Sequence, residues 1–238
     1  MKREILRHDS LRRFSCVLFH PDLPAPLQSA IMDQKGGLTM ELLCYGDSNT
    51  YGFDPRSYLG GRYPPQIRWT GRIASATGWS VREAGENGRT IPRRPWALKE
   101  LLRLAQTAQL VVVMSGSNDL LLDPHVTAEA AAARMGECLE VLFRERDPRS
   151  VLLIAPPPMV TGAWVPGEET LLQSARLGEC YAALARQLGV PFSDAGQWQV
   201  ELAFDGVHFS PSGHQAFARG LLPLLRRMAD GASPHITA

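Results

Sequence analysis

The chain has 238 residues, of which 45% are hydrophobic and 21% are charged. Its 25 lysine and arginine residues nearly balance 24 aspartate and glutamate residues, so the formal net charge is +1, which argues against nucleic acid as a partner. No apolar stretch approaches the roughly 18 residues that a membrane span requires. These figures predict a soluble globular protein with one sizeable core.

The N-terminal segment does not share the pattern of the rest of the chain. Five basic residues precede a brief apolar run, Phe14–Phe19. This run is shorter than the apolar core of a secretory signal, which favours a cytoplasmic protein over an exported one. Several prolines and glycines follow, and Met40 directly precedes the first regular pattern. We expect residues 1–39 to be an extension, with translation from Met40 as the alternative, and residues 40–238 to form the one domain.

The cysteines give a further indication of compartment. They are widely separated and include no Cys-x-x-Cys pair of the kind that binds zinc or carries redox chemistry. We therefore expect reduced thiols rather than disulfide partners at Cys16, Cys44, Cys138 and Cys180.

Short apolar runs alternate with segments of helical period from Met40 onward. The runs predict five strands, several of them continuous and therefore buried on both faces: Leu42–Tyr45, Val81–Ala84, Leu110–Met114, Val151–Ala155 and Val190–Phe192. The periodic segments predict five helices: Ile67–Thr77, Pro95–Thr107, Thr127–Arg146, Glu168–Leu188 and Pro211–Met228. This alternation predicts an α/β fold with three layers, α/β/α, and a five-stranded, mainly parallel sheet. Functional residues in such folds gather at the carboxyl ends of the strands.

The segment after the first predicted strand, Gly46–Gly52, presents a serine where the chain turns. The hydroxyl of Ser48 is a candidate nucleophile. The alternative is that Asp47, Ser48 and Asn49 only turn the chain and cap a helix.

The next two loops offer hydrogen-bond donors. Gly85–Thr90 contains two glycines with accessible backbone N–H groups, and Gly116–Asp119 contains Asn118, whose side-chain amide donates. Donors of both kinds make up an oxyanion hole, although each loop is otherwise an ordinary connection.

A carboxylate precedes an imidazole by three residues near the C-terminus, at Asp205 and His208. This spacing lets the carboxylate fix the tautomer of the ring, which leaves the other ring nitrogen to take a proton from a serine. Four loops at one edge of one sheet thus offer a serine, two sources of oxyanion donors and an Asp-His pair.

The four loops together resemble the signature blocks of the SGNH hydrolases, also called GDSL-type esterases and lipases, over about residues 40–228. The resemblance implies the flavodoxin-like fold of that family. It also implies Ser48 as nucleophile, His208 as general base and Asp205 as the residue that orients the histidine. The oxyanion would be held by the backbone N–H groups of Ser48 and Gly85 and by the side-chain amide of Asn118.

Two positions depart from the family pattern. Asn49 stands where the family's alternative name expects leucine, and Glu83 stands where many members have asparagine. Neither position has a catalytic role in the family. Three further segments, Arg68–Arg72, Ala155–Met159 and Pro191–Gly196, resemble the arylesterase and acyltransferase branch. That likeness implies short acyl groups, moved from esters to water or alcohols, and a homo-oligomer that narrows the entrance.

The sequence therefore predicts a serine esterase that acts on small carboxylic esters through an acyl-enzyme intermediate. Transfer of the acyl group to an alcohol, and the activity of a carbohydrate acetylesterase, a lysophospholipase or a thioesterase, stay open with the same site. Trp164, in the loop after the fourth strand, is the expected wall of the substrate pocket, with ordinary packing as its alternative.

Other classes of function fit less well. The Gly-x-Ser-x-Gly elbow of α/β-hydrolases is absent. A flavodoxin-like module that binds a phosphate or nucleotide through the first loop gives Asp205 and His208 no reason to face Ser48. No His-Glu-x-x-His motif occurs, so we expect neither a metal nor a cofactor. His214 is expected to hydrogen-bond locally within the last helix.

Overall fold

The computed structural model describes residues 31–32, 38–57 and 59–231. Most of the expected extension at residues 1–39, including Cys16, therefore lies outside the described residues. In the part that is described, two short strands, β1 (Ile31–Met32) and β2 (Leu38–Thr39), pair antiparallel ahead of the main sheet.

The main sheet has five strands in the order β4-β3-β5-β6-β7, and every neighbouring pair is parallel. This order is that of flavodoxin-like folds, so the predicted fold class is confirmed. The strands are β3 (Glu41–Gly46), β4 (Ser80–Gly85), β5 (Leu110–Met114), β6 (Val151–Ala155) and β7 (Phe192–Asp194).

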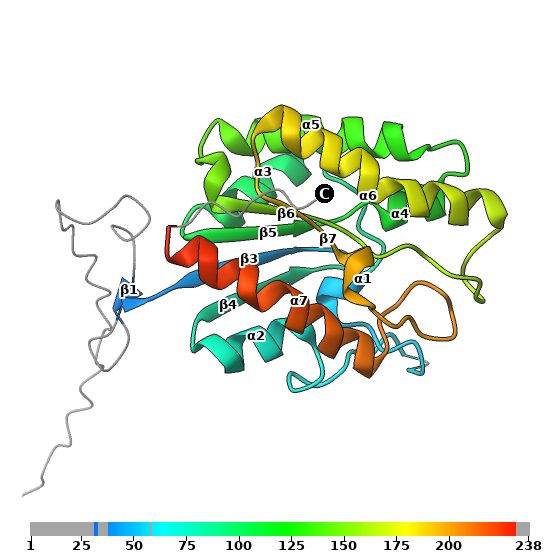
Figure 1. Cartoon of the computed structure of the whole chain (residues 1–238), viewed down its shortest axis with the longest axis horizontal. Helices are drawn as coiled ribbons and strands as arrows, with labels where there is room; N and C mark the ends of the chain where they lie inside the picture. The colour runs from blue at the N-terminus through cyan, green and yellow to red at the C-terminus, as the bar shows by residue number, and fades with distance from the viewer. Residues whose placement is uncertain (1–30, 33–37, 58, 232–238) are drawn as a thin grey trace, which may run out of the picture.

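Helices cover both faces of the sheet (Figure 1). One layer contains α2 (Trp69–Thr77) and α7 (Pro211–Ala229), and the other contains α3 (Pro95–Ala105), α5 (Ala128–Phe143) and α6 (Glu168–Leu188). All residues of β3, β5 and β6 are buried, as expected for strands that are covered on both sides.

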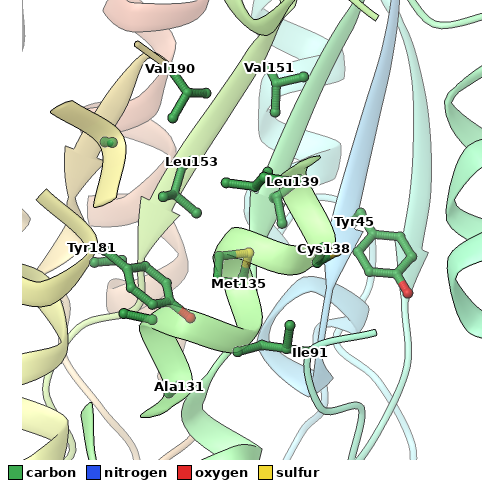
Figure 2. Packing of buried hydrophobic residues seen from close by; sticks show 14 of the residues in the cluster. Tyr45, Ile91, Ala131, Met135, Cys138, Leu139, Val151, Leu153, Tyr181 and Val190 are labelled. Atoms are coloured by element: carbon green, nitrogen blue, oxygen red, sulfur yellow. The ribbon is translucent and has the colours of Figure 1, made fainter. Parts of the chain in front are cut away.

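The buried strands β3, β5 and β6 supply alternate residues to two separate hydrophobic clusters. In β6, Val151 and Leu153 belong to the cluster under α3, α5 and α6, whereas Leu152 and Ile154 belong to the cluster under α7. Figure 2 shows part of the first cluster, in which Met135 and Leu139 of α5 pack with Val151 and Leu153 of β6 and with Tyr181 of α6. The period-2 alternation of a strand thus fills both layers. The described thiols are all free, with Cys44 and Cys138 buried and Cys180 partly buried.

The structure differs from the sequence prediction at β7, which begins at Phe192 rather than at Val190. Pro191 has no N–H group for a ladder, and only its carbonyl oxygen is used, as the acceptor for the N–H of Leu153 at 2.9 Å. Two short helices, α1 (Ser48–Tyr51) and α4 (Ser117–Leu122), were not predicted, because a helix this short shows no apolar period.

The strand order places a switch point between β3 and β5, which are neighbours in the sheet. The chain that leaves β3 runs to α2 on one face of the sheet, and the chain that leaves β5 runs to α5 on the other face, so a crevice lies between them. The helices α1 and α4 begin at this crevice. No helix within the described ranges is long and apolar enough to cross a membrane.

Candidate active site

Ser48 is the first residue of α1, directly after β3. Asp47 caps this helix, because its Oδ1 accepts a hydrogen bond from the N–H of Asn49 at 2.9 Å. The helix ends after one turn at Gly52, whose φ of 82° is in the left-handed region that favours glycine. A sharp strand-to-helix turn therefore holds the Ser48 hydroxyl at the carboxyl edge of the sheet.

The structure brings Ser48, His208 and Asp205 together. His208 Nε2 lies 2.9 Å from Ser48 Oγ, and His208 Nδ1 lies 2.7 Å from Asp205 Oδ2. The other carboxylate oxygen of Asp205 accepts hydrogen bonds from the backbone N–H groups of Val207 and His208, both at 3.0 Å. Because an ionised carboxylate only accepts, Nδ1 carries the proton, and Nε2 is free to accept the proton of the serine hydroxyl.

Two buried carboxyl groups at this site, those of Asp205 and Asp47, have pKa values shifted in opposite directions. Burial raises the pKa of Asp205, but the hydrogen bonds from the His208 ring and from the two backbone N–H groups outweigh that effect and hold the pKa below its usual value. Burial raises the pKa of Asp47 to about 6, and the hydrogen bond from the N–H of Asn49 offsets only part of the shift. Asp205 is therefore ionised at neutral pH, as orienting the imidazole requires.

The two loops that the sequence predicts to supply oxyanion donors follow β4 and β5. The Nδ2 of Asn118 donates to the carbonyl oxygen of Arg89 at 3.0 Å, which fixes the orientation of the amide. Gly88, with φ of 74°, lines the same cavity as Asn118. The predicted Gly85 does not line it, because Gly85 is the last residue of β4 and a Cβ there would lie 2.0 Å from the backbone nitrogen of Tyr51. Glycine at position 85 serves the packing of β4 against α1, and the geometry favours Gly88 at the cavity.

Arg89 holds this loop in place, a role that the sequence did not reveal. Its guanidinium donates to the carbonyl oxygen of Gly46 at 3.0 Å and to that of Ala84, and pairs with Glu86 at 2.7 Å. The guanidinium carbon lies 4.4 Å from the centre of the Tyr45 ring. The loop after β4 is thereby attached to the ends of both β3 and β4.

A cavity of about 270 Å³ opens beside the serine. The predicted wall residue Trp164 lines it, with its ring centre 4.9 Å from that of His208, and its side chain is 55% exposed. Phe53, which the sequence analysis did not assign, lies 4.6 Å from His208 and 5.7 Å from Trp164 between ring centres. The full lining consists of Ser48, Phe53, Asn87, Gly88, Asn118, Leu121, Leu122, Trp164, Val207 and His208.

The two positions that depart from the family pattern lie outside this lining. Glu83 pairs with Arg62 at 2.7 Å and with Arg68 at 2.9 Å, which ties the segment after α1 to β4. Asn49 points its side chain toward the loop that carries His208.

His214 makes a different contact from the one predicted. Its Nδ1 accepts a hydrogen bond from the backbone N–H of Trp69 in α2, at 3.4 Å, rather than from its own helix. Burial lowers the pKa of His214 to about 3, so the ring is neutral. Within the described residues, no group of three histidine, cysteine, aspartate or glutamate side chains is placed to hold a metal ion.

The sequence profile of the GDSL-like lipase/acylhydrolase family matches residues 44–216. The chain belongs to this family. The match includes Ser48, Gly88, Asn118, Asp205 and His208, and it places the chain among hydrolases that act on ester bonds. A comparison with curated proteins finds no match.

Solved structures of similar proteins agree with the family. A carbohydrate acetylesterase family member from Sinorhizobium meliloti is 30% identical, with a TM-score of 0.69, over 81% of this chain and 100% of that chain. The aryl esterase of M. smegmatis is 26% identical, with a TM-score of 0.70, over 80% of this chain and 100% of that chain. A second carbohydrate acetylesterase from Sinorhizobium meliloti is 25% identical, with a TM-score of 0.69, over the same shares. The predicted SGNH hydrolase fold is therefore confirmed.

Proposed function

We propose that the protein is a serine esterase that hydrolyses short-chain carboxylic esters through Ser48, His208 and Asp205. One observation carries the proposal. The Ser48 hydroxyl, both ring nitrogens of His208 and the Asp205 carboxylate form a continuous chain of hydrogen bonds, at 2.9 and 2.7 Å, beside an open cavity. A module that only binds phosphate has no need of this alignment.

The reaction proceeds in two steps. The Oγ of Ser48 attacks the ester carbonyl while His208 Nε2 takes the hydroxyl proton, and Asp205 stabilises the imidazolium that forms. The tetrahedral intermediate collapses, and His208 gives the proton to the departing alcohol. Water then attacks the acyl-enzyme by the same route and releases the acid. An alcohol in place of water gives acyl transfer.

Three donors would hold the negative oxygen of the intermediate. They are the backbone N–H of Ser48, the side-chain amide of Asn118 and a backbone N–H from the second loop. We assign the third donor to Gly88 in place of Gly85, because Gly88 lines the cavity with Ser48 and Asn118.

The cavity favours a small acyl group. Its volume of about 270 Å³ is below the usual range of about 300–1,000 Å³ for ligand pockets, and Phe53, Leu121 and Trp164 give it an apolar wall. Acetyl and propionyl esters fit this description best. An acetylated sugar is the second candidate, since the relative at 30% identity is a carbohydrate acetylesterase family member.

Hydrolysis of p-nitrophenyl acetate, butyrate and octanoate tests the proposal. The purified protein and Ser48→Ala are compared in buffer with a metal chelator, and an acetylated monosaccharide is assayed in parallel for acetate release. We expect activity that resists the chelator, is lost in Ser48→Ala and falls as the acyl chain lengthens. Equal activity of the two proteins on every ester would contradict the proposal.

A further inference from the structure

Asn49 joins the helix that carries Ser48 to the loop that carries His208. Its Nδ2 donates to the carbonyl oxygen of Val207 at 3.1 Å, and its Oδ1 accepts from the backbone N–H of Phe209 at 2.8 Å. These two partners are the residues on either side of His208. One side-chain amide therefore fixes the backbone both before and after the imidazole.

Asn49 is itself held rigidly. Its backbone N–H donates to Asp47 Oδ1 at 2.9 Å, and its carbonyl oxygen accepts from the indole Nε1 of Trp69 at 3.0 Å. The residue is only 4% exposed. Both backbone groups and both ends of the side-chain amide thus have partners, which is the condition under which a buried polar network specifies one geometry.

We propose that Asn49 is a positioning residue that sets the distance between Ser48 Oγ and His208 Nε2. The inference rests on the proposed function. Ser48 and Asn49 are consecutive in α1, so a side chain that holds the loop against Asn49 also holds the imidazole against the serine. Leucine, which the family's alternative name expects here, has no donor or acceptor and would leave the buried groups of Val207 and Phe209 without these partners.

The test uses Asn49→Leu and Asn49→Asp with the p-nitrophenyl acetate assay. Rates are divided by the number of competent sites, measured as the burst of p-nitrophenolate, so that partial unfolding does not count as lost turnover. Gln106→Glu is the matched control, because it makes the same amide-to-acid change at an exposed position at the end of α3. Ser48→Ala is assayed beside them.

We expect the kcat of Asn49→Leu to fall about 10²-fold, which is the cost of displacing a catalytic group by about 1 Å. KM should change less than about threefold, because Asn49 does not line the cavity. Asn49→Asp keeps the acceptor for Phe209 but, when ionised, turns an acceptor toward the carbonyl of Val207. A protonated carboxyl donates to that carbonyl instead, so the ratio of Asn49→Asp to wild-type kcat should rise as the pH is lowered.

The outcomes separate the two claims. Three results would overturn this inference: a kcat of Asn49→Leu within about threefold of wild type, an effect confined to KM, or a pH-independent ratio of Asn49→Asp to wild-type kcat. The proposed function would stay intact in each case as long as Ser48→Ala loses activity. Hydrolysis that persists in Ser48→Ala would overturn the proposed function and the inference with it.

Discussion

Replacing Asp47 by asparagine should stabilise the protein at neutral pH while leaving it nearly unchanged in acid. Asp47 is 2% exposed, and burial raises its pKa from 3.8 to about 6. Below pH 3.8 the carboxyl is protonated in both the folded and the unfolded chain. Above about pH 6 the Asp47 carboxyl is ionised in both states, and the folded chain then carries a buried charge. At about 1.4 kcal/mol per pKa unit, wild type loses about 3 kcal/mol of its unfolding free energy as the pH rises through this window.

Asparagine removes the charge and keeps the cap, because its Oδ1 still accepts the N–H of Asn49. The free energy of unfolding, measured by urea titration at pH 4, 5, 6 and 7, should therefore differ between Asp47→Asn and wild type by an amount that grows with pH toward about 3 kcal/mol. Asp123→Asn is the matched control, since Asp123 makes the same bond to the N–H two residues on but is exposed. Parallel curves for Asp47→Asn and wild type across this range would refute the reasoning.

Three further changes test the site and the core. Asn118→Ala should lower kcat for p-nitrophenyl acetate by about 10²- to 10³-fold through loss of an oxyanion donor, and a loss below about threefold would remove Asn118 from the site. Gly162→Ala should push the loop that carries Trp164 away from the loop that carries Asp205, because a Cβ at position 162 would lie 2.2 Å from the carbonyl carbon of Asp205. Gly167→Ala is the control, since a Cβ at position 167 meets nothing within 4 Å. The kcat/KM for octanoate relative to acetate should then rise about tenfold in Gly162→Ala and not in Gly167→Ala, and an equal ratio in both would contradict the coupling of the two loops. Leu153→Ala, in the cluster of Figure 2, should lower the unfolding free energy in urea by about 2–5 kcal/mol, and a loss under about 1 kcal/mol would show that the residue is not in a packed core.

Most of the fold was predictable because its signals are local. The apolar runs of β5 and β6 are buried on both faces, and their predicted bounds, Leu110–Met114 and Val151–Ala155, match the structure. The bounds of α6, Glu168–Leu188, also match. The strand β7 was placed two residues early, because Ser193 and Asp194 are polar and only pairing with β6 makes them part of a strand.

The site was predictable to the extent that its residues follow strands or lie close together in sequence. Ser48 follows β3, and the three-residue spacing of Asp205 and His208 predicts the contact that the structure shows between them. The choice between Gly85 and Gly88 could not be predicted, because spacing does not reveal which glycine packs on α1 and which faces the cavity. The two glycines are separated by the backbone contact between Gly85 and Tyr51 and by the place of Gly88 in the cavity lining.

The sequence left Asn49 and Phe53 without an assigned role for a different reason. Both contact the loop around His208, which lies more than 150 residues further along the chain: Asn49 hydrogen-bonds to Val207, and the Phe53 ring lies against that of His208. No periodicity or local spacing encodes such a contact, which exists only once the sheet has brought the loops together.

The most direct test of the central claim is the site of covalent modification by a fluorophosphonate ester. Such a reagent captures an activated serine as a stable tetrahedral adduct, and mass spectrometry of the intact protein and its peptides locates the adduct. We predict one adduct per chain, on Ser48, formed in step with the loss of esterase activity and absent from His208→Ala. Hydrolysis that continues with Ser48 unmodified, or an adduct on another residue that accompanies the loss of activity, would contradict the account.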